Sequence, residues 1–200
     1  LLDINVINDF NVSSGGMVAF NHHYFNDKTL FKYFNVIANK TIKIGNEAFN
    51  SAEFGIINLY ANGPIIFANN SFFNCATMEL LSLSTNADIT FDPFSFQNSK
   101  MQEMSIHNYD EHQLITEQIF YGTVKFCRQS FSRSRNLNRI IIQIKGNVYL
   151  DENLFEKNEV LSTVLIKSNG TLHIGNNAFV DCFSGAQIYI DTKENEISPC

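Results

Sequence analysis

The chain has no tryptophan, only three prolines and few charged residues, which make up 17% of its 200 positions. It also lacks any run of about 18 apolar residues, the length that a membrane-spanning helix needs. No basic and then apolar leader opens the chain. Its first residue is Leu1 and not methionine, so we expect it to be part of a longer protein, whose cellular location these features leave open.

Positive charge is scarce as well. The formal net charge of −6 and the isoelectric point near 5.3 argue against nucleic-acid binding, which needs a dominant basic face. One local basic stretch has no interleaved aromatic side chains, so we interpret it as a solvated surface. It consists of Lys125, Arg128, Arg133, Arg135, Arg139 and Lys145.

The cysteines form no recognisable metal or redox motif. Cys75, Cys127, Cys182 and Cys200 have no CxxC spacing, which excludes zinc-finger and thioredoxin-like sites. We therefore expect no cofactor.

What the chain does contain is a repeat. TIKIGNEAF at 41–49 returns as TLHIGNNAF at 171–179, and both strings place apolar residues seven and five positions before a phenylalanine. The same template recurs along the chain at seven anchor phenylalanines: Phe25, Phe49, Phe72, Phe96, Phe131, Phe155 and Phe179. The steps between successive anchors are 24, 23, 24, 35, 24 and 24 residues, which indicates one repeat length and a single insertion.

A second apolar block, of the form LxxIxI, follows the anchors, as in FKYFNV at 31–36 and MELLSL at 78–83. Its last three positions alternate in, out and in, as in a strand buried on one face. We predict a mainly β repeat solenoid over residues 1–200, with about seven coils, both ends open and one parallel-sheet strand per coil. The anchors then stack as a buried aromatic ladder, and LLDINV at 1–6 fits the second block of an earlier coil.

The strings IGNEAF, IGNNAF and FFNCATMELLSL resemble the BspA-like class of leucine-rich repeats, found in surface proteins of some bacteria and many protist parasites. The resemblance covers nearly the whole chain. It implies a leucine-rich-repeat arc with coils of about 24 residues and favours a cell-surface or secreted location. The motif residues are structural, so they imply no catalytic residue.

Two expectations concern the turns. Gly45 and Gly175 lie between the first apolar pair and the anchor, where we expect a turn with positive φ. Cys75 and Cys182 each follow an anchor by three residues, and we interpret them as packing residues that lie too many coils apart for a disulfide.

The inward positions of such a solenoid form its scaffold, so we expect binding at outward strand positions. The predicted central outward row reads Asn5, Asn35, Asn58, Ser82, Ser105, Ile141, Leu165 and Tyr189. Its first half is able to form a hydrogen-bonded amide ladder, and its second half exposes three large apolar side chains. Flanking outward positions add Tyr33, Ile37, Ile56, Tyr60 and Leu80. We predict a surface for a protein or glycan partner, with cover by another segment of the full protein as the alternative.

The insertion near residues 107–123 carries the only dense cluster of potential metal ligands: His107, Asp110, Glu111 and His112. Their spacing matches neither an EF-hand loop nor an HExxH helix, so we predict no metal site and interpret the segment as a solvated or partner-contacting loop.

The preferred functional hypothesis is a binding or adhesion module. We predict that it is non-catalytic, because the chain shows no convergent acid, base or nucleophile, and we expect it to contact neither nucleic acid nor membrane. A parallel β-helix enzyme acting on polysaccharides is one alternative, and it requires clustered carboxylates on one sheet face. The other alternative is a scaffold arm of an intracellular signalling protein.

Overall fold

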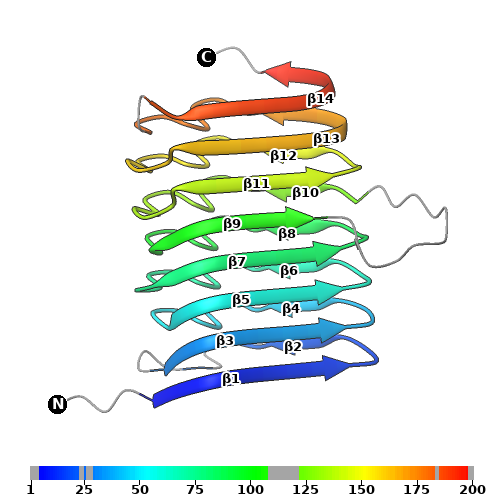
Figure 1. Ribbon diagram of the computed structural model, residues 1–200, viewed down its shortest axis with the longest axis vertical. Coiled ribbons are helices and arrows are strands. Elements are labelled where there is room, and N and C mark those ends of the chain that lie inside the picture. Colours follow the sequence, from blue (N-terminus) through cyan, green and yellow to red (C-terminus); the bar gives the residue numbers. More distant parts are fainter. Residues whose placement is uncertain (1–4, 23–24, 26–28, 108–121, 183–184, 198–200) are drawn as a thin grey trace.

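The computed structural model describes residues 5–22, 25, 29–107, 122–182 and 185–197, which form strands joined by turns (Figure 1). Six longer strands are β1 (Asn5–Ser14), β3 (Thr29–Ala38), β5 (Glu53–Ala61), β7 (Met78–Thr85), β9 (Met101–His107) and β11 (Arg139–Ile144). Six three-residue strands are β2 (Val18–Phe20), β4 (Ile42–Ile44), β6 (Ile65–Phe67), β8 (Ile89–Phe91), β10 (Val124–Phe126) and β12 (Val148–Leu150). The last two, β13 (Thr163–Ile174) and β14 (Gln187–Ile197), run along both faces.

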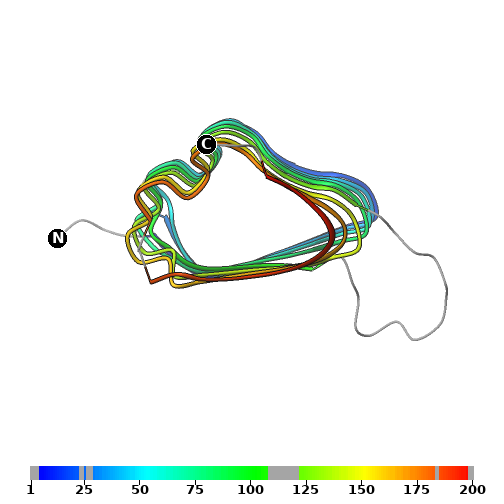
Figure 2. The same ribbon diagram turned by 90° about the horizontal axis from the view of Figure 1, so that it is seen from above.

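Every strand pair is parallel, in the order β1-β3-β5-β7-β9-β11-β13-β12-β10-β8-β6-β4-β2, with β14 on β13. The long strands thus form one face and the short strands another, and β13 joins the two into one sheet that wraps around the interior (Figure 2). The predicted mainly β parallel solenoid of about seven coils is confirmed, and the structure adds a row of short strands on the second face.

Local hydrophobic pattern explains both strand types. In β4 the two isoleucines are buried and Lys43 between them is exposed, which is the period-2 pattern of a half-buried strand. In β3 the buried Phe31 and Phe34 are separated by two exposed residues, so the strand turns two successive side chains outward. The spacing of the LxxIxI block therefore determines which side chains face outward.

The anchor phenylalanines form the predicted ladder through the interior. The ring centroids of Phe72 and Phe96 are 4.7 Å apart, and those of Phe96 and Phe131 are 5.0 Å apart, with interplanar angles of 7° and 4°. Parallel stacking at this spacing adds to the free energy that ring burial contributes. Phe96 and Phe131 stack although they lie 35 residues apart, so the insertion leaves the core unbroken.

In the six coils whose anchor turns the structure describes, two residues have a left-handed backbone, one lying two positions before the anchor and the other two positions after it. All twelve are residues other than glycine, with φ between 52° and 61°. Asparagine and aspartate tolerate this conformation best, and they fill half of the twelve positions. They are Asn70, Asn74, Asn98, Asn153, Asn177 and Asp181.

The expectation for Gly45 and Gly175 was wrong, because no described glycine has a positive φ. A Cβ added at Gly45 would instead lie 2.7 Å from the carbonyl oxygen of Phe20 in the preceding coil. Close approach of neighbouring coils, and not backbone conformation, therefore favours glycine at this place.

The assignment of the first strand was also wrong. Asn11, and not Asn5, pairs with Asn35, because β1 uses the block INDFNV at 7–12 in place of LLDINV. That register stacks Phe10 on Phe34, with centroids 4.8 Å apart and rings 6° from parallel. Aromatic stacking on the next coil selects between two frames that the local pattern allows equally.

Candidate functional site

The eight residues predicted to bind a partner all lie on the outer face of the long-strand sheet. Strand register aligns this face into three rows that cross the strands. The first row is Asp9, Tyr33, Ile56, Leu80, Glu103, Arg139, Thr163 and Gln187. The middle row is Asn11, Asn35, Asn58, Ser82, Ser105, Ile141, Leu165 and Tyr189. The third row is Ser13, Ile37, Tyr60, Ser84, His107, Gln143, Lys167 and Asp191.

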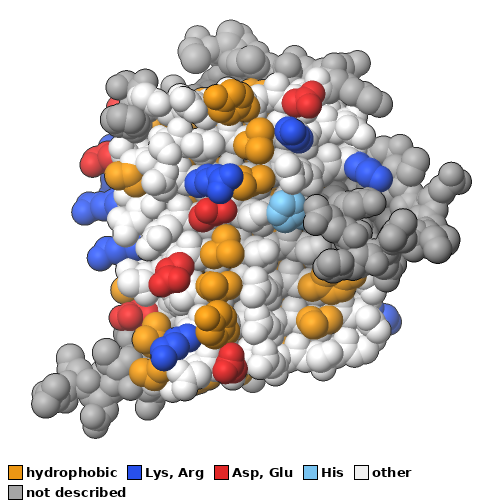
Figure 3. All heavy atoms as spheres, viewed as in Figure 1, with side chains coloured by type: hydrophobic (Ala, Val, Ile, Leu, Met, Phe, Trp, Pro, Cys, Tyr) orange, Lys and Arg blue, Asp and Glu red, His pale blue; other side chains and the backbone are white. Residues whose placement is uncertain are grey.

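The structure divides the predicted residues into two groups. Tyr33, Ile56 and Leu80 are consecutive in the first row, with Ile37 and Tyr60 opposite them in the third. We call these five the N-terminal group. Ile141, Leu165 and Tyr189 are consecutive in the middle row and form the C-terminal group. Figure 3 shows apolar side chains in a line across the strands, interrupted by charged ones between the two groups.

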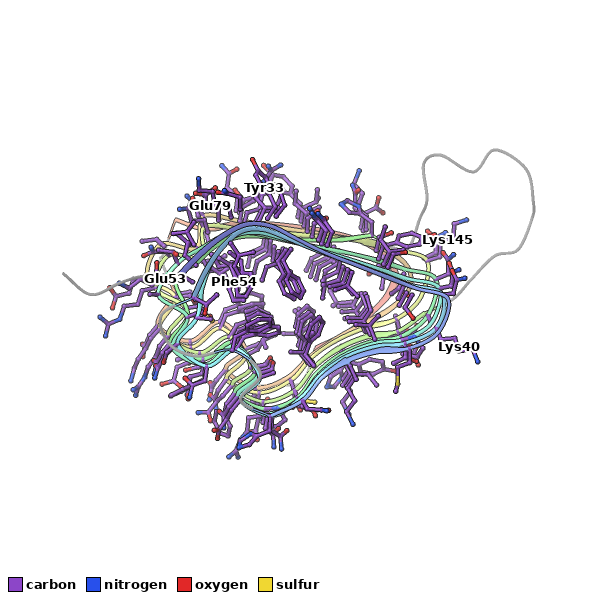
Figure 4. All side chains as sticks on the ribbon, turned by 90° about the horizontal axis from the view of Figure 1, so that it is seen from below. Tyr33, Lys40, Glu53, Phe54, Glu79 and Lys145 are labelled. Atoms are coloured by element: carbon purple, nitrogen blue, oxygen red, sulfur yellow. The ribbon has the colours of Figure 1, made fainter. Side chains whose placement is uncertain are left out.

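Both groups are accessible from solvent. Tyr33, Ile37 and Tyr189 have exposed fractions of 47%, 49% and 56%, and the other five residues are half-buried against their row neighbours. Figure 4 shows Tyr33 pointing away from the interior while Phe54 points into it. Outward apolar side chains on adjacent strands make a contiguous patch, which is typical of interaction surfaces.

The N-terminal group flanks an amide ladder. Asn35 donates from Nδ2 to Oδ1 of Asn11, and Asn58 donates from Nδ2 to Oδ1 of Asn35, both at 2.8 Å. The predicted ladder is thus confirmed, with Asn11 as its first member. Because each amide is bonded to the next, the ladder holds these exposed side chains in one orientation.

Between the two groups, β9 presents polar side chains that the sequence did not single out as a set. Glu103 on β9 forms an ion pair with Arg139 on the neighbouring strand β11, with 3.7 Å between the carboxylate oxygen and the guanidinium nitrogen. Both side chains are partly solvated, so this pair contributes about 0.2–1 kcal/mol. The sequence did contain a signal for this set: Glu103, Ser105 and His107 are two residues apart in a strand, and this spacing places all three side chains on the same face.

Ser105 Oγ lies 2.5 Å from Nε2 of His107, a contact between a hydroxyl and a base. Nucleophilic catalysis by such a pair needs a third group that orients the imidazole and donors for an oxyanion. Within the residues that the structure describes, no carboxylate is bonded to the other ring nitrogen of His107. We therefore interpret the contact as a surface hydrogen bond.

The insertion itself lies mostly outside the described residues. Of its cluster, Asp110, Glu111 and His112 are not described, and His107 ends β9 in the third row. Just after the insertion, Thr123 donates its backbone N–H to Oδ1 of Asp88, with 2.7 Å between nitrogen and oxygen. No group of three or more metal-ligating side chains occurs elsewhere in the described chain.

The basic stretch does not form one surface. Lys125 faces outward from the short strand β10, Arg139 faces outward from the long strand β11, and Arg133 lies in the anchor turn between them. Arg128 pairs with Glu152 at 3.7 Å. This dispersal agrees with the interpretation of the stretch as solvated surface.

The three cysteines that the structure describes are poor candidates for chemistry; Cys200 lies outside the described residues. Cys75 is fully buried, and Cys127 and Cys182 are half-buried. Burial raises the pKa of each of the three thiols above its ordinary value. Since the thiolate is the reactive form, these residues are less nucleophilic than free cysteine. The interpretation of Cys75 as a packing residue is confirmed.

Within the described part of the chain there is no helix long and apolar enough to cross a membrane. A search of curated proteins and a search of solved structures both find no match to this chain. The family model described as the BspA type leucine rich repeat region matches residues 18–127 and 122–200, in six copies. This match spans most of the chain, so the protein belongs to the BspA-type leucine-rich-repeat family.

Proposed function

We propose that this chain is a non-catalytic binding and adhesion module of a surface protein, which presents its long-strand face to a protein or glycan partner. The observation that carries the proposal is the C-terminal group. Ile141, Leu165 and Tyr189 are direct neighbours on three consecutive strands and point outward. Tyrosine and large apolar side chains are enriched at the buried centres of interfaces.

The packing of the core supports a binding role for the outward positions. The anchors and the inward strand positions are occupied by packing residues, so we expect substitutions there to lower stability more than substitutions in the three outward rows. The outward rows are therefore the part of the repeat that is free to specialise.

The alternative of a polysaccharide-active enzyme needs two clustered carboxylates, and the three outward rows hold no such pair. The exposed Glu79 lies beside the rows on β7, next to β9, but Glu103 on β9 is already ion-paired with Arg139. Acidic side chains among the described residues of the three rows are Asp9, Glu103 and Asp191, and Glu103 lies at least three inter-strand steps from either of the others. At about 4.8 Å per strand this exceeds 10 Å, whereas glycosidases hold their two carboxyl groups about 5–9.5 Å apart.

Binding of the purified chain to host cells and to immobilised matrix proteins tests the proposal. We expect the triple variant Ile141→Asp, Leu165→Asp, Tyr189→Asp to lose at least tenfold in affinity. The matched control is Tyr149→Asp, which changes a 38%-exposed tyrosine on the outer side of β12. Equal binding by the wild type and the triple variant would exclude the C-terminal group as the contact surface.

The surface location is tested separately. We expect antibodies against the chain to label intact cells without permeabilisation. Labelling that requires permeabilisation would instead favour the scaffold arm of an intracellular protein.

A further inference from the structure

The amide ladder of the N-terminal half has unused hydrogen-bonding capacity that faces solvent. A primary amide has two N–H donors and an oxygen with two lone pairs. Asn35 uses one donor toward Asn11 and one lone pair toward Asn58, so its remaining N–H and lone pair have no partner within the described part of the chain. Asn58 keeps its oxygen and one N–H among the described residues, and Asn11 keeps both N–H groups.

These amides are preorganised for a ligand. The two 2.8 Å bonds fix the side-chain torsions that a free asparagine would lose on binding, so a ligand orders fewer groups when it docks. Beside the ladder, the Oη of Tyr60 donates to Asn62 Oδ1 at 3.3 Å, which also orients this ring. The amide ladder is therefore a polar and rigid row, and the apolar side chains of the N-terminal group lie on both sides of it.

The nine residues that β3, β5 and β7 contribute to the three rows are uncharged. They are tyrosine, isoleucine, leucine, asparagine and serine only. In the first row, Asp9 and Glu103 lie on either side of the three apolar residues of the N-terminal group. Beside that row, Lys32 precedes Tyr33 on β3 and Glu79 precedes Leu80 on β7, and both charged side chains are exposed. These charges are of both signs and lie outside the middle row, which presents only amides and hydroxyls from Asn11 to Ser105. A ligand that lies on the middle row therefore meets no charged partner within that row, which favours a neutral ligand.

Spacing separates the neutral candidates. Successive amides lie on neighbouring strands, which are about 4.8 Å apart, whereas an extended peptide advances about 3.3 Å per residue and falls out of step with the ladder. A β-1,4-linked hexopyranose chain advances by nearly the inter-strand spacing per sugar. Its hydroxyls are donors and acceptors that amides bind, and its C–H faces pack on aromatic rings such as that of Tyr33.

We propose that the N-terminal half of the sheet face binds a neutral, β-linked linear glycan, which lies across the strands along Asn11, Asn35 and Asn58. Tyr33 and Tyr60 pack against sugar rings on either side of the ladder. This inference rests on the proposed function, since it uses the same sheet face, and it names the ligand class for one half of that face.

Saturation-transfer NMR and calorimetric titration of the purified chain with cellohexaose test the proposal. Maltohexaose, an α-linked glucose hexamer, is the linkage control, and polygalacturonate is the charge control. We expect binding of cellohexaose alone. Asn35→Ala and Tyr33→Ala are each expected to lower its affinity at least tenfold, whereas Asn169→Ala and Tyr149→Ala, which change exposed residues off this face, are expected to leave it unchanged.

Tyr33→Ala changes an exposed side chain, so it keeps the test valid if Asn35→Ala unfolds the protein. Absence of a cellohexaose signal at millimolar concentration, or equal affinity in the Tyr33→Ala and wild-type chains, overturns the inference. The triple variant of the C-terminal group separates the two proposals. If partner binding depends on that group while cellohexaose does not bind, only the glycan inference fails; if neither partner nor glycan binds, the proposed function fails as well.

Discussion

Cys75 donates its thiol hydrogen to the backbone carbonyl oxygen of Phe49, the anchor one coil earlier, with 3.3 Å between Sγ and the oxygen. The residue three positions after the anchor repeats this bond in other coils, at 2.9–3.0 Å. The pairs are Ser134 with Phe96, Asn158 with Phe131, and Cys182 with Phe155. This position therefore joins successive coils by a side-chain hydrogen bond, in addition to filling space.

Alkaline pH is expected to destabilise the protein through its buried thiols. Burial raises the pKa of Cys75 above its ordinary value of 9.0, so between that value and the raised one the unfolded chain loses a proton that the folded chain retains. The free energy of unfolding is thus expected to be unaffected below about pH 8 and to fall as pH rises past about 9. Urea denaturation between pH 7 and 10.5 measures this change.

The matched variant is Cys75→Ser, which keeps a donor at the position where Ser134 occurs in another coil. We expect a smaller loss of stability at alkaline pH in this variant than in the wild type. Parallel pH profiles for the two proteins would contradict the assignment of the effect to Cys75.

Ser95→Ala is expected to stabilise the protein. Ser95 is fully buried just before the anchor Phe96, and its hydroxyl has no hydrogen-bond partner among the described residues. An unpaired buried hydroxyl costs about 1–3 kcal/mol, and Ala48 and Ala178 occupy the same position before Phe49 and Phe179. Thermal and urea unfolding measure the gain.

The matched variant Ser134→Ala removes an equally buried hydroxyl that does bond, at 3.0 Å to the carbonyl oxygen of Phe96. We expect it to lose about 1 kcal/mol. Changes of the same sign in Ser95→Ala and Ser134→Ala would show that hydrogen bonding does not decide the outcome.

Phe96→Ala is expected to cost about 3–5 kcal/mol, because it removes a fully buried ring that stacks on both sides of the ladder. Phe25 is half-buried and stacks only on Phe49 within the ladder, with centroids 5.4 Å apart. Phe25→Ala is therefore expected to cost distinctly less. Chemical denaturation measures the free energy of unfolding of both variants. Equal losses of stability would contradict the expectation that a ring stacked on both sides contributes more than a ring at the end of the ladder.

Asn70→Ala is expected to lower stability by about 1 kcal/mol, since alanine disfavours the left-handed conformation that this residue adopts at φ 56°. Asn70→Gly keeps that conformation accessible and is expected to unfold close to the wild type. Asn46→Ala, at an exposed position with ordinary φ, controls for loss of an amide. Thermal unfolding of the three variants ranks them, and an equal effect at Asn70 and Asn46 would contradict the conformational explanation.

The coil length and the inward columns could be predicted because each depends on a local pattern. An anchor phenylalanine and the two apolar residues before it recur at a fixed distance, and burial of one face requires no more information than that. The outward row from Asn35 to Tyr189 followed from the same register. The amide ladder could be predicted as well, since identical side chains on neighbouring parallel strands face each other.

Only the tertiary structure decided which groups meet between coils. Two overlapping blocks near the N-terminus satisfy the same local pattern, and lateral pairing with stacking of Phe10 on Phe34 selects one of them. Glu103 and Arg139 lie on opposite sides of the insertion in the sequence, and they meet only because the two coils that carry them stack next to each other. The buried hydroxyl of Ser95 is likewise a consequence of packing. The sequence determined the repeat through short-range hydrophobic periodicity, whereas contacts between residues one coil apart depend on strand register and side-chain packing, which arise only when the coils stack.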